Sequence, residues 1–395
     1  MQTSNDVNSR DSTSKYTALG FAFIGVFALL IVRGALFYNE WGDYIWFLQP
    51  WLQEYRGMTF IEGLSTKVGN YNHSYMYILN IIARIDFSEL YLIKSVSVIF
   101  DLLLSYFVMK IVSLKSESIN MRILAFLLAF AIPTVVLNSS MWGQCDSIYA
   151  AFAIGSVYFG LSGRGKAAYA FMALAFSFKM QAVFLMPVFP VFIFMRKIKL
   201  QDCYVFFVTF LATLLPAIIA GMPLDDVFLV YFRQVDYFSR LNMNIANVWR
   251  FIDHVDYDSF VTAGLYVTGL AVLGLMYFTF VNRARLVKNV DYIRLFYLFA
   301  IIMPYLLPKM HDRYYFLADV LSLLVFLFDK RRWYVPVVTV FCSFIAYAYF
   351  LMSGITLFDY RFAALALLFV ILIVLRDFVV SLSPAPVDPV DNNCQ

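Results

Sequence analysis

The sequence predicts an all-α, polytopic transmembrane helical bundle, and two observations predict it. Hydrophobic residues make up 62% of the 395 residues and charged residues only 14%, whereas charged residues make up about a quarter of a soluble globular domain. The first apolar run, residues 16–38, exceeds the ~20 residues that a helix needs to cross a bilayer. Because the net charge is only +4 and the basic residues are scattered, nothing favours nucleic-acid binding.

The apolar runs predict about 10 to 13 spans, including broken or re-entrant helices. We expect spans near residues 16–38, 90–111, 121–138, 144–161, 167–178, 183–195, 203–221, 260–281, 295–308, 313–328, 334–352 and 358–377. Two pairs of short runs, 167–178 with 183–195 and 295–308 with 313–328, each flank a polar point. A break of this kind is tolerated only where the backbone faces protein or water.

The charges between the runs predict the topology. Residues 1–15 are polar and lack the features of a signal peptide, so we expect a cytoplasmic tail before a retained first span. Most basic loops then fall on the cytoplasmic side, as the positive-inside rule requires. We expect one transmembrane domain over 16–380, with long outer loops near 39–89 and 222–259, and a disordered cytoplasmic tail at 381–395. The first outer loop is expected to carry short amphipathic helices.

The segment PKMHDRYYFLAD (residues 308–319) places Lys309, His311 and Arg313 between two apolar runs. Ionisable residues at membrane depth are costly, so they indicate a functional site. A guanidinium beside an imidazole and an ammonium group is suited to an anion such as a phosphate. Lys179, which lies between two apolar half-spans, is either a further phosphate ligand or a lysine whose ammonium group reaches the interface.

Asp43, shortly after the first span, is a candidate general base. The neighbouring Trp41 and Trp46 are consistent with partial desolvation that holds the carboxyl pKa near the working pH. They are equally consistent with a solvated aspartate in an interfacial helix that carries an aromatic belt.

The cluster NSSMWGQCD (residues 138–146) lies between two expected spans. Asp146 is typical of a helix cap, but a cap does not require Trp142 and Gln144 as well. An aromatic face and an amide suit a sugar, which offers C–H surfaces and hydroxyls.

Two further patterns concern structure and metals. Lys94 and Asp101 are seven residues apart in an apolar run and share a helix face, which predicts an internal ion pair between them. The four cysteines show no CxxC spacing, so neither a disulfide framework nor a zinc site follows.

Five segments carry a family resemblance. They are GDYIWFLQPW (42–51), NYNHSYMYILN (70–80), WGQCDSIYAAF (142–152), FSFKMQAVFLMP (176–187) and LPKMHDRYYFLADVLS (307–322). Together they resemble bacterial membrane mannosyltransferase-like proteins related to the enzyme that adds the second mannose of GPI anchors, in the C-type glycosyltransferase (GT-C) superfamily. The resemblance implies a GT-C-type bundle in the bacterial cytoplasmic (inner) membrane, and the basic loops place both termini in the cytoplasm.

The resemblance also implies an inverting transfer from a polyprenyl-phosphate sugar donor on the non-cytoplasmic face, with a carboxylate of the first outer loop as the base. Asp43 matches that position. Because this loop has no Asp-Asp or Asp-Glu doublet, Asp146 remains a second candidate.

We therefore expect a hexosyltransferase that moves mannose or another hexose from the lipid donor to a glycan or glycolipid acceptor. The expected ligands of the donor phosphate are Lys179, Lys309, His311 and Arg313. The residues expected to contact the sugar or the acceptor are Trp142, Gln144, Gln181, Tyr71, His73, Asn247 and Tyr314. No metal cofactor is implied, although the Asp-rich loop 222–259 has ligands for a divalent ion. A transporter or flippase of lipid-linked sugars and a polysaccharide polymerase or ligase are the alternatives.

Overall fold

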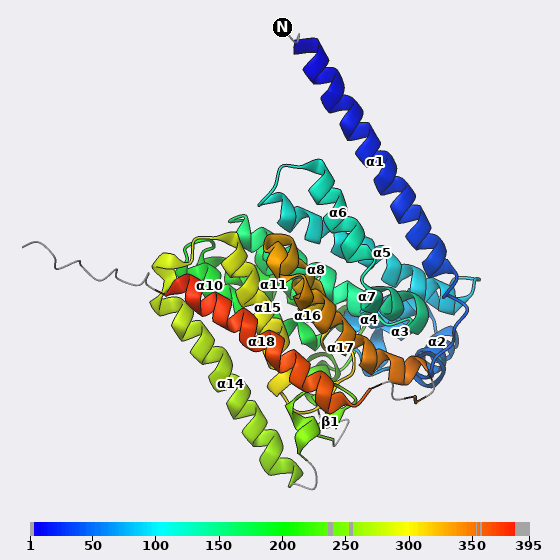
Figure 1. Cartoon of the computed structure of the whole chain (residues 1–395). Coiled ribbons are helices and arrows are strands. Elements are labelled where there is room, and N and C mark those ends of the chain that lie inside the picture. Colours follow the sequence, from blue (N-terminus) through cyan, green and yellow to red (C-terminus); the bar gives the residue numbers. More distant parts are fainter. Residues whose placement is uncertain (1–3, 236–239, 253–255, 353, 356–357, 384–395) are drawn as a thin grey trace, which may run out of the picture.

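The computed structural model describes residues 4–235, 240–252, 256–352, 354–355 and 358–383. Over these residues the protein is a bundle of helices (Figure 1). Within the same residues the strands are two residues long, and β1 (Asn242–Met243) pairs in parallel with β2 (Met310–His311). The predicted all-α class is confirmed.

The helices of the first half, in chain order, are α1 (Ser4–Gly34), η1 (Tyr44–Leu48), α2 (Gln49–Arg56), α3 (Phe60–Ser65), α4 (His73–Ile82), α5 (Glu89–Ser113), α6 (Ile119–Phe130), α7 (Pro133–Val136), η2 (Leu137–Trp142), α8 (Asp146–Leu161), α9 (Gly165–Phe178), η3 (Met180–Leu185) and α10 (Val188–Phe194). Those of the second half are η4 (Leu200–Cys203), α11 (Tyr204–Ile219), α12 (Leu224–Phe228), α13 (Val230–Val235), η5 (Val248–Phe251), α14 (Tyr257–Val281), η6 (Arg283–Arg285), α15 (Asn289–Leu306), α16 (Phe316–Phe328), η7 (Lys330–Arg332), α17 (Tyr334–Leu351) and α18 (Tyr360–Leu382).

Six helical segments of the described chain are long and apolar enough to cross a membrane. They are Tyr16–Gly34, Glu89–Ser113, Leu200–Ile219, Tyr257–Val281, Lys330–Leu351 and Tyr360–Leu382. A seventh span results if α6 and the segment Pro133–Trp142, which meet at an angle of 53°, are counted as one. The chain thus has the helices of a multi-pass membrane protein, but fewer of full length than the predicted 10 to 13 or so. The remaining apolar runs form shorter helices, such as Asp146–Leu161 and Phe316–Phe328.

Both predicted breaks are present. α9 ends at Phe178, Lys179 has extended backbone angles, and the chain resumes as η3. α15 ends at Leu306, and β2 with a turn separates it from α16. One break was not predicted: the run 121–138 is divided by Pro133, which has no backbone N–H to continue α6 and instead begins α7.

The predicted outer loop 39–89 folds into short helices, as expected. Thr59 and Glu62 form a reciprocal capping box that begins α3, with bonds of 2.7 and 3.3 Å. Asn72 begins α4 by accepting a hydrogen bond of 2.7 Å from the backbone N–H of His73. The chain therefore leaves α1, turns, and presents this compact layer beside α5 and α11.

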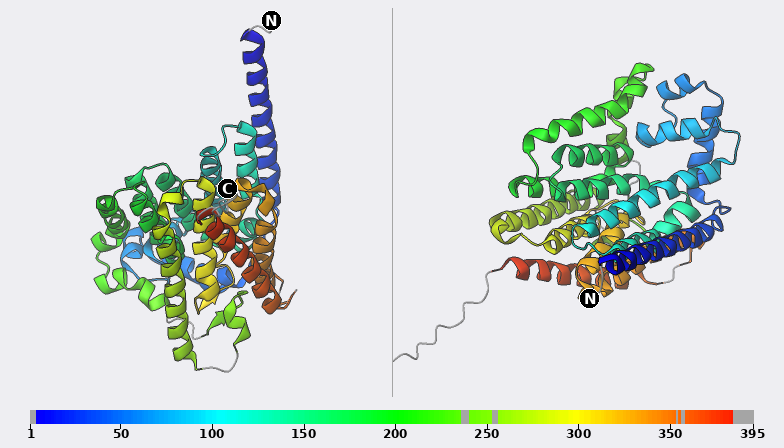
Figure 2. Two further views of the ribbon diagram at one scale, coloured as in Figure 1. Left: turned by 60° about the vertical axis from the view of Figure 1, so that its left-hand side comes forward. Right: turned by 90° about the horizontal axis from the view of Figure 1, so that it is seen from above.

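Helix α1 lies at the edge of the bundle and extends beyond it at its N-terminal end (Figures 1 and 2). Near its other end, the buried Arg33 donates to the Asp101 carboxylate at 2.7 Å and to Ser139 Oγ at 2.8 Å. Ser147 and Ser139 also donate to Asp101. One acid of α5 therefore joins α1, η2 and α8.

The predicted pair between Lys94 and Asp101 is wrong. Asp101 pairs with Arg33 instead, while the Lys94 ammonium group donates to the backbone carbonyls of Leu36, Phe37 and Asn39 at 3.3, 2.9 and 2.6 Å. Each group on α5 thus finds a closer partner in the segment that leads from α1 toward Asp43. The seven-residue spacing of Lys94 and Asp101 shows that they share a face of α5, but it does not show which other segments pack against that face.

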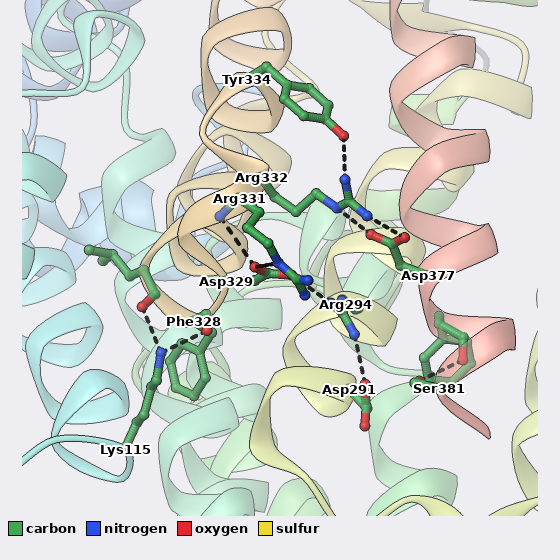
Figure 3. Close-up of polar contacts among 12 residues, drawn as sticks. Lys115, Asp291, Arg294, Phe328, Asp329, Arg331, Arg332, Tyr334, Asp377 and Ser381 are labelled. Atoms are coloured by element: carbon green, nitrogen blue, oxygen red, sulfur yellow. Dashed lines mark hydrogen bonds and ion pairs between the residues drawn. The ribbon is translucent and has the colours of Figure 1, made fainter. Parts of the chain in front are cut away.

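Basic residues of the loop after α5, of α15 and of η7 lie close together (Figure 3). Arg294 pairs with Asp291 at 3.0 Å and with Asp329 at 2.9 Å, and Arg332 holds Asp377 through bonds of 2.5 and 2.6 Å. Lys115, from the loop after α5, donates to the carbonyl of Phe328 at 2.7 Å. This end of α15 and α16 is opposite to the turn that carries His311 and Arg313.

Candidate functional site

Residues from four distant segments meet at the other end of α15 and α16. They are Asp43 before η1, the segment from Trp142 to Asp146 between η2 and α8, Lys179 after α9, and Arg313 before α16. The local sequence explains how each is presented. Gly143, for example, has φ +79°, a left-handed conformation that glycine adopts without strain, and it ends η2 so that Gln144 turns back.

Arg313 is the centre of the site. Its Nη1 lies 3.5 Å from Oδ2 of Asp43 and its Nε lies 3.5 Å from Oδ2 of Asp146. Its Nη1 is also 3.6 Å from Oδ1 of Asp312. The guanidinium therefore has three carboxylates around it, each at ion-pair distance.

Asp146 is fully engaged. Its Oδ1 accepts a hydrogen bond from Lys179, and its Oδ2 accepts one of 2.8 Å from Asn138. The side chain is only 1% exposed. Asn138 also donates to the hydroxyl of Tyr347 at 3.1 Å. This carboxylate is therefore held from both sides and is not reachable by solvent.

Asp43 is different, because its side chain is 28% exposed. Its Oδ2 accepts hydrogen bonds from the indole N–H of Trp142 at 3.0 Å and from Nε2 of Gln144 at 2.5 Å. Its Oδ1 makes no hydrogen bond within the described part of the chain. One oxygen is thus anchored and the other is available.

Trp142 is placed to orient Asp43. The side chain is buried, and its ring contacts those of Tyr347 and Phe350 at centroid distances of 5.3 and 5.4 Å. The Arg313 guanidinium lies 5.3 Å from the same ring. The indole, predicted to stack on a sugar, is surrounded by protein.

Burial changes the pKa of two groups in the turn before α16. Burial, followed by the charges of Arg313 and Lys179, lowers the pKa of His311 to about 3. His311 is therefore neutral at neutral pH and adds a polar ring, not a positive charge, to the predicted anion site. Burial raises the pKa of Asp312 to about 7, in spite of the opposing charge of Arg313.

A hollow lies next to this cluster, on the side of the segment 39–89. It encloses about 310 Å³ of empty space, its open mouth included, and it is lined by Tyr55, Lys67, Tyr71, His73 and Tyr77 among others. His73 is 5% exposed, and its Nε2 has no hydrogen-bond partner within the described residues. Tyr71 joins the hollow to the cluster, because its ring lies 5.8 Å from the Lys179 ammonium group.

The structure does not bring every predicted residue to the cluster. The Lys309 ammonium group lies 5.5 Å from the ring of Tyr257, at the start of α14. Asn247 is buried, donates to the carbonyl of Pro304 at 3.2 Å, and caps η5 by accepting from the backbone of Trp249. Its contacts are those of a structural residue.

The other two predicted sugar-contacting residues lie close to the cluster in the chain. Gln181 is buried two residues after Lys179, and its Oε1 has no hydrogen-bond partner within the described residues. Tyr314 follows Arg313, and its ring lies 5.3 Å from that of His311.

Sequence reasoning assigned no role to Asn138, Asp312 or Arg33. The signal for Arg33 was present, since an arginine inside the first apolar run is an ionisable residue at membrane depth. Asp312 lies inside the segment 308–319, but only its burial in the structure distinguishes it from an ordinary loop aspartate.

A metal site is not formed by the described residues, since they contain no group of three or more His, Cys, Asp or Glu side chains that could hold an ion. In the predicted Asp-rich loop, Asp225 and Asp226 are paired with Arg233. Asp236 and Asp253 of that loop lie outside the described residues.

The fold and the site together are those of a helical protein with the apolar helices of a multi-pass membrane protein and a partly buried cluster of Asp, Arg and Lys side chains at one end of the bundle. No protein-family model matches the chain, and no curated protein sequence matches it either.

Proposed function

We propose that this protein is an integral membrane glycosyltransferase of the GT-C type. It transfers mannose or another hexose from a polyprenyl-phosphate donor to a glycan or glycolipid acceptor on the non-cytoplasmic face. The observation that carries the proposal is the ion pair of a partly exposed carboxylate, Asp43, with Arg313, beside a second cation, the buried Lys179, which pairs with Asp146. A base beside an anion site is what such a transfer needs.

In the proposed reaction, Oδ1 of Asp43 takes the proton of an acceptor hydroxyl. The hydroxyl oxygen attacks the anomeric carbon of the donor and forms the new glycosidic bond. The bond between that carbon and the phosphate oxygen breaks, and polyprenyl phosphate leaves with the electron pair. Arg313 and Lys179 stabilise the negative charge that grows on the phosphate. Attack opposite to the leaving group inverts the anomeric carbon.

The geometry favours Asp43 over Asp146 as the base. Both oxygens of Asp146 already accept hydrogen bonds, and its side chain is 1% exposed. Asp146 is therefore proposed as a positioning residue that holds Lys179 and Arg313. Trp142 and Gln144 hold Asp43 in the same way, so that its free oxygen faces the acceptor.

The hollow lined by Tyr71 and His73 is the proposed place of the acceptor. It adjoins the cluster through Tyr71. Its tyrosine rings and the buried His73 Nε2 suit a hydroxyl-bearing ligand better than a charged one, since the nearby Lys67 is paired with Asp226 at 3.4 Å.

The test is sugar transfer by purified protein in detergent, with a labelled polyprenyl-phosphate hexose and a glycolipid acceptor. We expect Asp43→Asn to lower the turnover about 100-fold or more, the usual size of a general-base contribution. Asp86→Asn, an exposed aspartate of the same loop, is the matched control and should retain the wild-type rate. Wild-type turnover in Asp43→Asn would contradict the assignment. A transporter would give no transfer in detergent, where no sealed compartment exists.

A further inference from the structure

The charges of the site do not balance when every acid is ionised. Asp43, Asp146 and Asp312 lie within 3.5 to 3.6 Å of the Arg313 guanidinium, and Lys179 is the second cation. Three carboxylates with two cations leave one negative charge in a site whose acids are mostly buried. An uncompensated buried charge is costly, so a proton is expected on one of the acids.

Asp312 is the acid best placed to hold that proton. Asp43 accepts hydrogen bonds from Trp142 and Gln144, and Asp146 accepts from Asn138 and Lys179. Both of these carboxylates therefore have hydrogen-bond donors from neighbouring side chains. Asp312 is 1% exposed, as Asp146 is, and it accepts a hydrogen bond from the backbone N–H of Arg313, but its Oδ1 has no hydrogen-bond partner within the described residues.

The groups that face Asp312 come from several elements. The charged groups are Arg313 of its own turn, Asp43 of the outer loop and Asp146 of α8. The tyrosines are Tyr347 of α17 and Tyr360 of α18. Of these charged groups Arg313 alone is a cation, and it is shared with the two other acids, while the guanidinium of Arg250 lies 4.4 Å from the Tyr360 ring. Burial is the largest influence on the carboxyl, and it raises the pKa of Asp312 to about 7.

We propose that Asp312 is a positioning residue which carries a proton when the site binds its anionic ligand, and which weakens that binding when it ionises. The proposal rests on the proposed function only in taking the ligand to be a lipid phosphate. With Asp312 neutral, the two cations balance Asp43 and Asp146, and the Arg313 guanidinium can turn toward a phosphate. With Asp312 ionised, a third carboxylate competes for Arg313 and repels the ligand.

The experiment measures the binding of farnesyl phosphate to the full chain in nanodiscs between pH 6 and 9. For the wild type we expect the dissociation constant to rise about tenfold for each pH unit above 7, because binding requires one proton. In Asp312→Asn, which cannot ionise, the dissociation constant should not rise with pH. In Asp312→Glu, which keeps a carboxyl group, it should rise again. A flat wild-type profile, or an equal rise in Asp312→Asn, would overturn the proposal.

Two controls separate a change in the protonation of Asp312 from other causes of a pH-dependent loss of binding. Asp86→Asn should follow the wild-type profile, and thermal unfolding of each variant identifies a protein that has lost its fold. If Asp312→Asn does not fold, infrared difference spectra of the wild type between pH 6 and 8 decide, since a protonated carboxyl absorbs apart from a carboxylate. The loss of one protonated-carboxyl band that shifts in Asp312→Glu supports the proposal, and the absence of such a band overturns it, since a band of the buried Asp319 would not shift. Because neither readout requires turnover, the failure of sugar transfer would refute the proposed function without touching this result.

Discussion

Replacing Arg33 with glutamine tests how α1 is joined to the bundle. The Arg33 guanidinium donates to Asp101 at 2.7 Å, to Ser139 at 2.8 Å and to the carbonyl of Phe130 at 2.6 Å, and its side chain is 1% exposed. Removing one partner of a buried ion pair costs about 3 to 5 kcal/mol, because the other charge is left without compensation. Asp101 keeps Ser139 and Ser147 as donors, so we expect the lower limit, about 3 kcal/mol.

The assay is the free energy of unfolding in mixed micelles, in a double-mutant cycle with Asp101→Asn. The two single losses should not add, because they remove the same interaction, and a coupling of about 2 kcal/mol is expected. Arg361→Gln is the control: its partner is Asp359, and both side chains are exposed, so a loss below about 1 kcal/mol is expected. A loss below about 1 kcal/mol in Arg33→Gln, or strict additivity in the cycle, would refute this account.

Three further outcomes are expected. Lys94→Met should speed the exchange of backbone amide hydrogens in residues 36–39 as measured by mass spectrometry, because Lys94 holds three carbonyls of that segment; unchanged exchange would contradict this role. His311→Gln should leave the pH dependence of farnesyl phosphate binding between pH 5 and 8 unchanged, since a histidine whose pKa is lowered to about 3 has no charge to lose there. An altered pH dependence would show that His311 carries a charge in this range. Gly160→Ala should lower thermal stability by about 1 to 3 kcal/mol, because a Cβ there would lie 2.2 Å from the Phe192 ring, whereas Gly274→Ala, with open space around it, should not.

The class of fold followed from composition, and the two polar breaks followed from charged residues inside apolar runs. The number of full-length spans did not follow, because a run of apolar residues has the same hydropathy whether its helix is straight or bent. Pro133 is the clearest example: it lies inside one apolar run and divides it into α6 and α7. Its effect on backbone hydrogen bonding was readable from the sequence.

The candidate site was predicted in part of its members but not in its pairings. Asp43, Asp146, Lys179 and Arg313 meet as expected, yet they meet through direct ion pairs, and the described hollow lies beside them. Which cation pairs with which acid depends on how distant segments pack. The spacing of residues along one helix does not show how distant segments pack. Lys94 is the example: it was predicted to pair with Asp101 and instead donates to the carbonyl of Phe37.

The attachment of α1 has a consequence for how the protein responds to its surroundings. Within the span Tyr16–Gly34 only 11% is buried, and the helix is fastened to the bundle near Arg33, ten residues before Asp43. A helix that faces lipid along most of its length tilts when the hydrocarbon layer becomes thicker or thinner. Such a tilt would displace the Asp43 side of the site while Arg313 stays with α16. Acyl-chain length should therefore alter the activity, and equal rates in short-chain and long-chain bilayers would exclude this coupling.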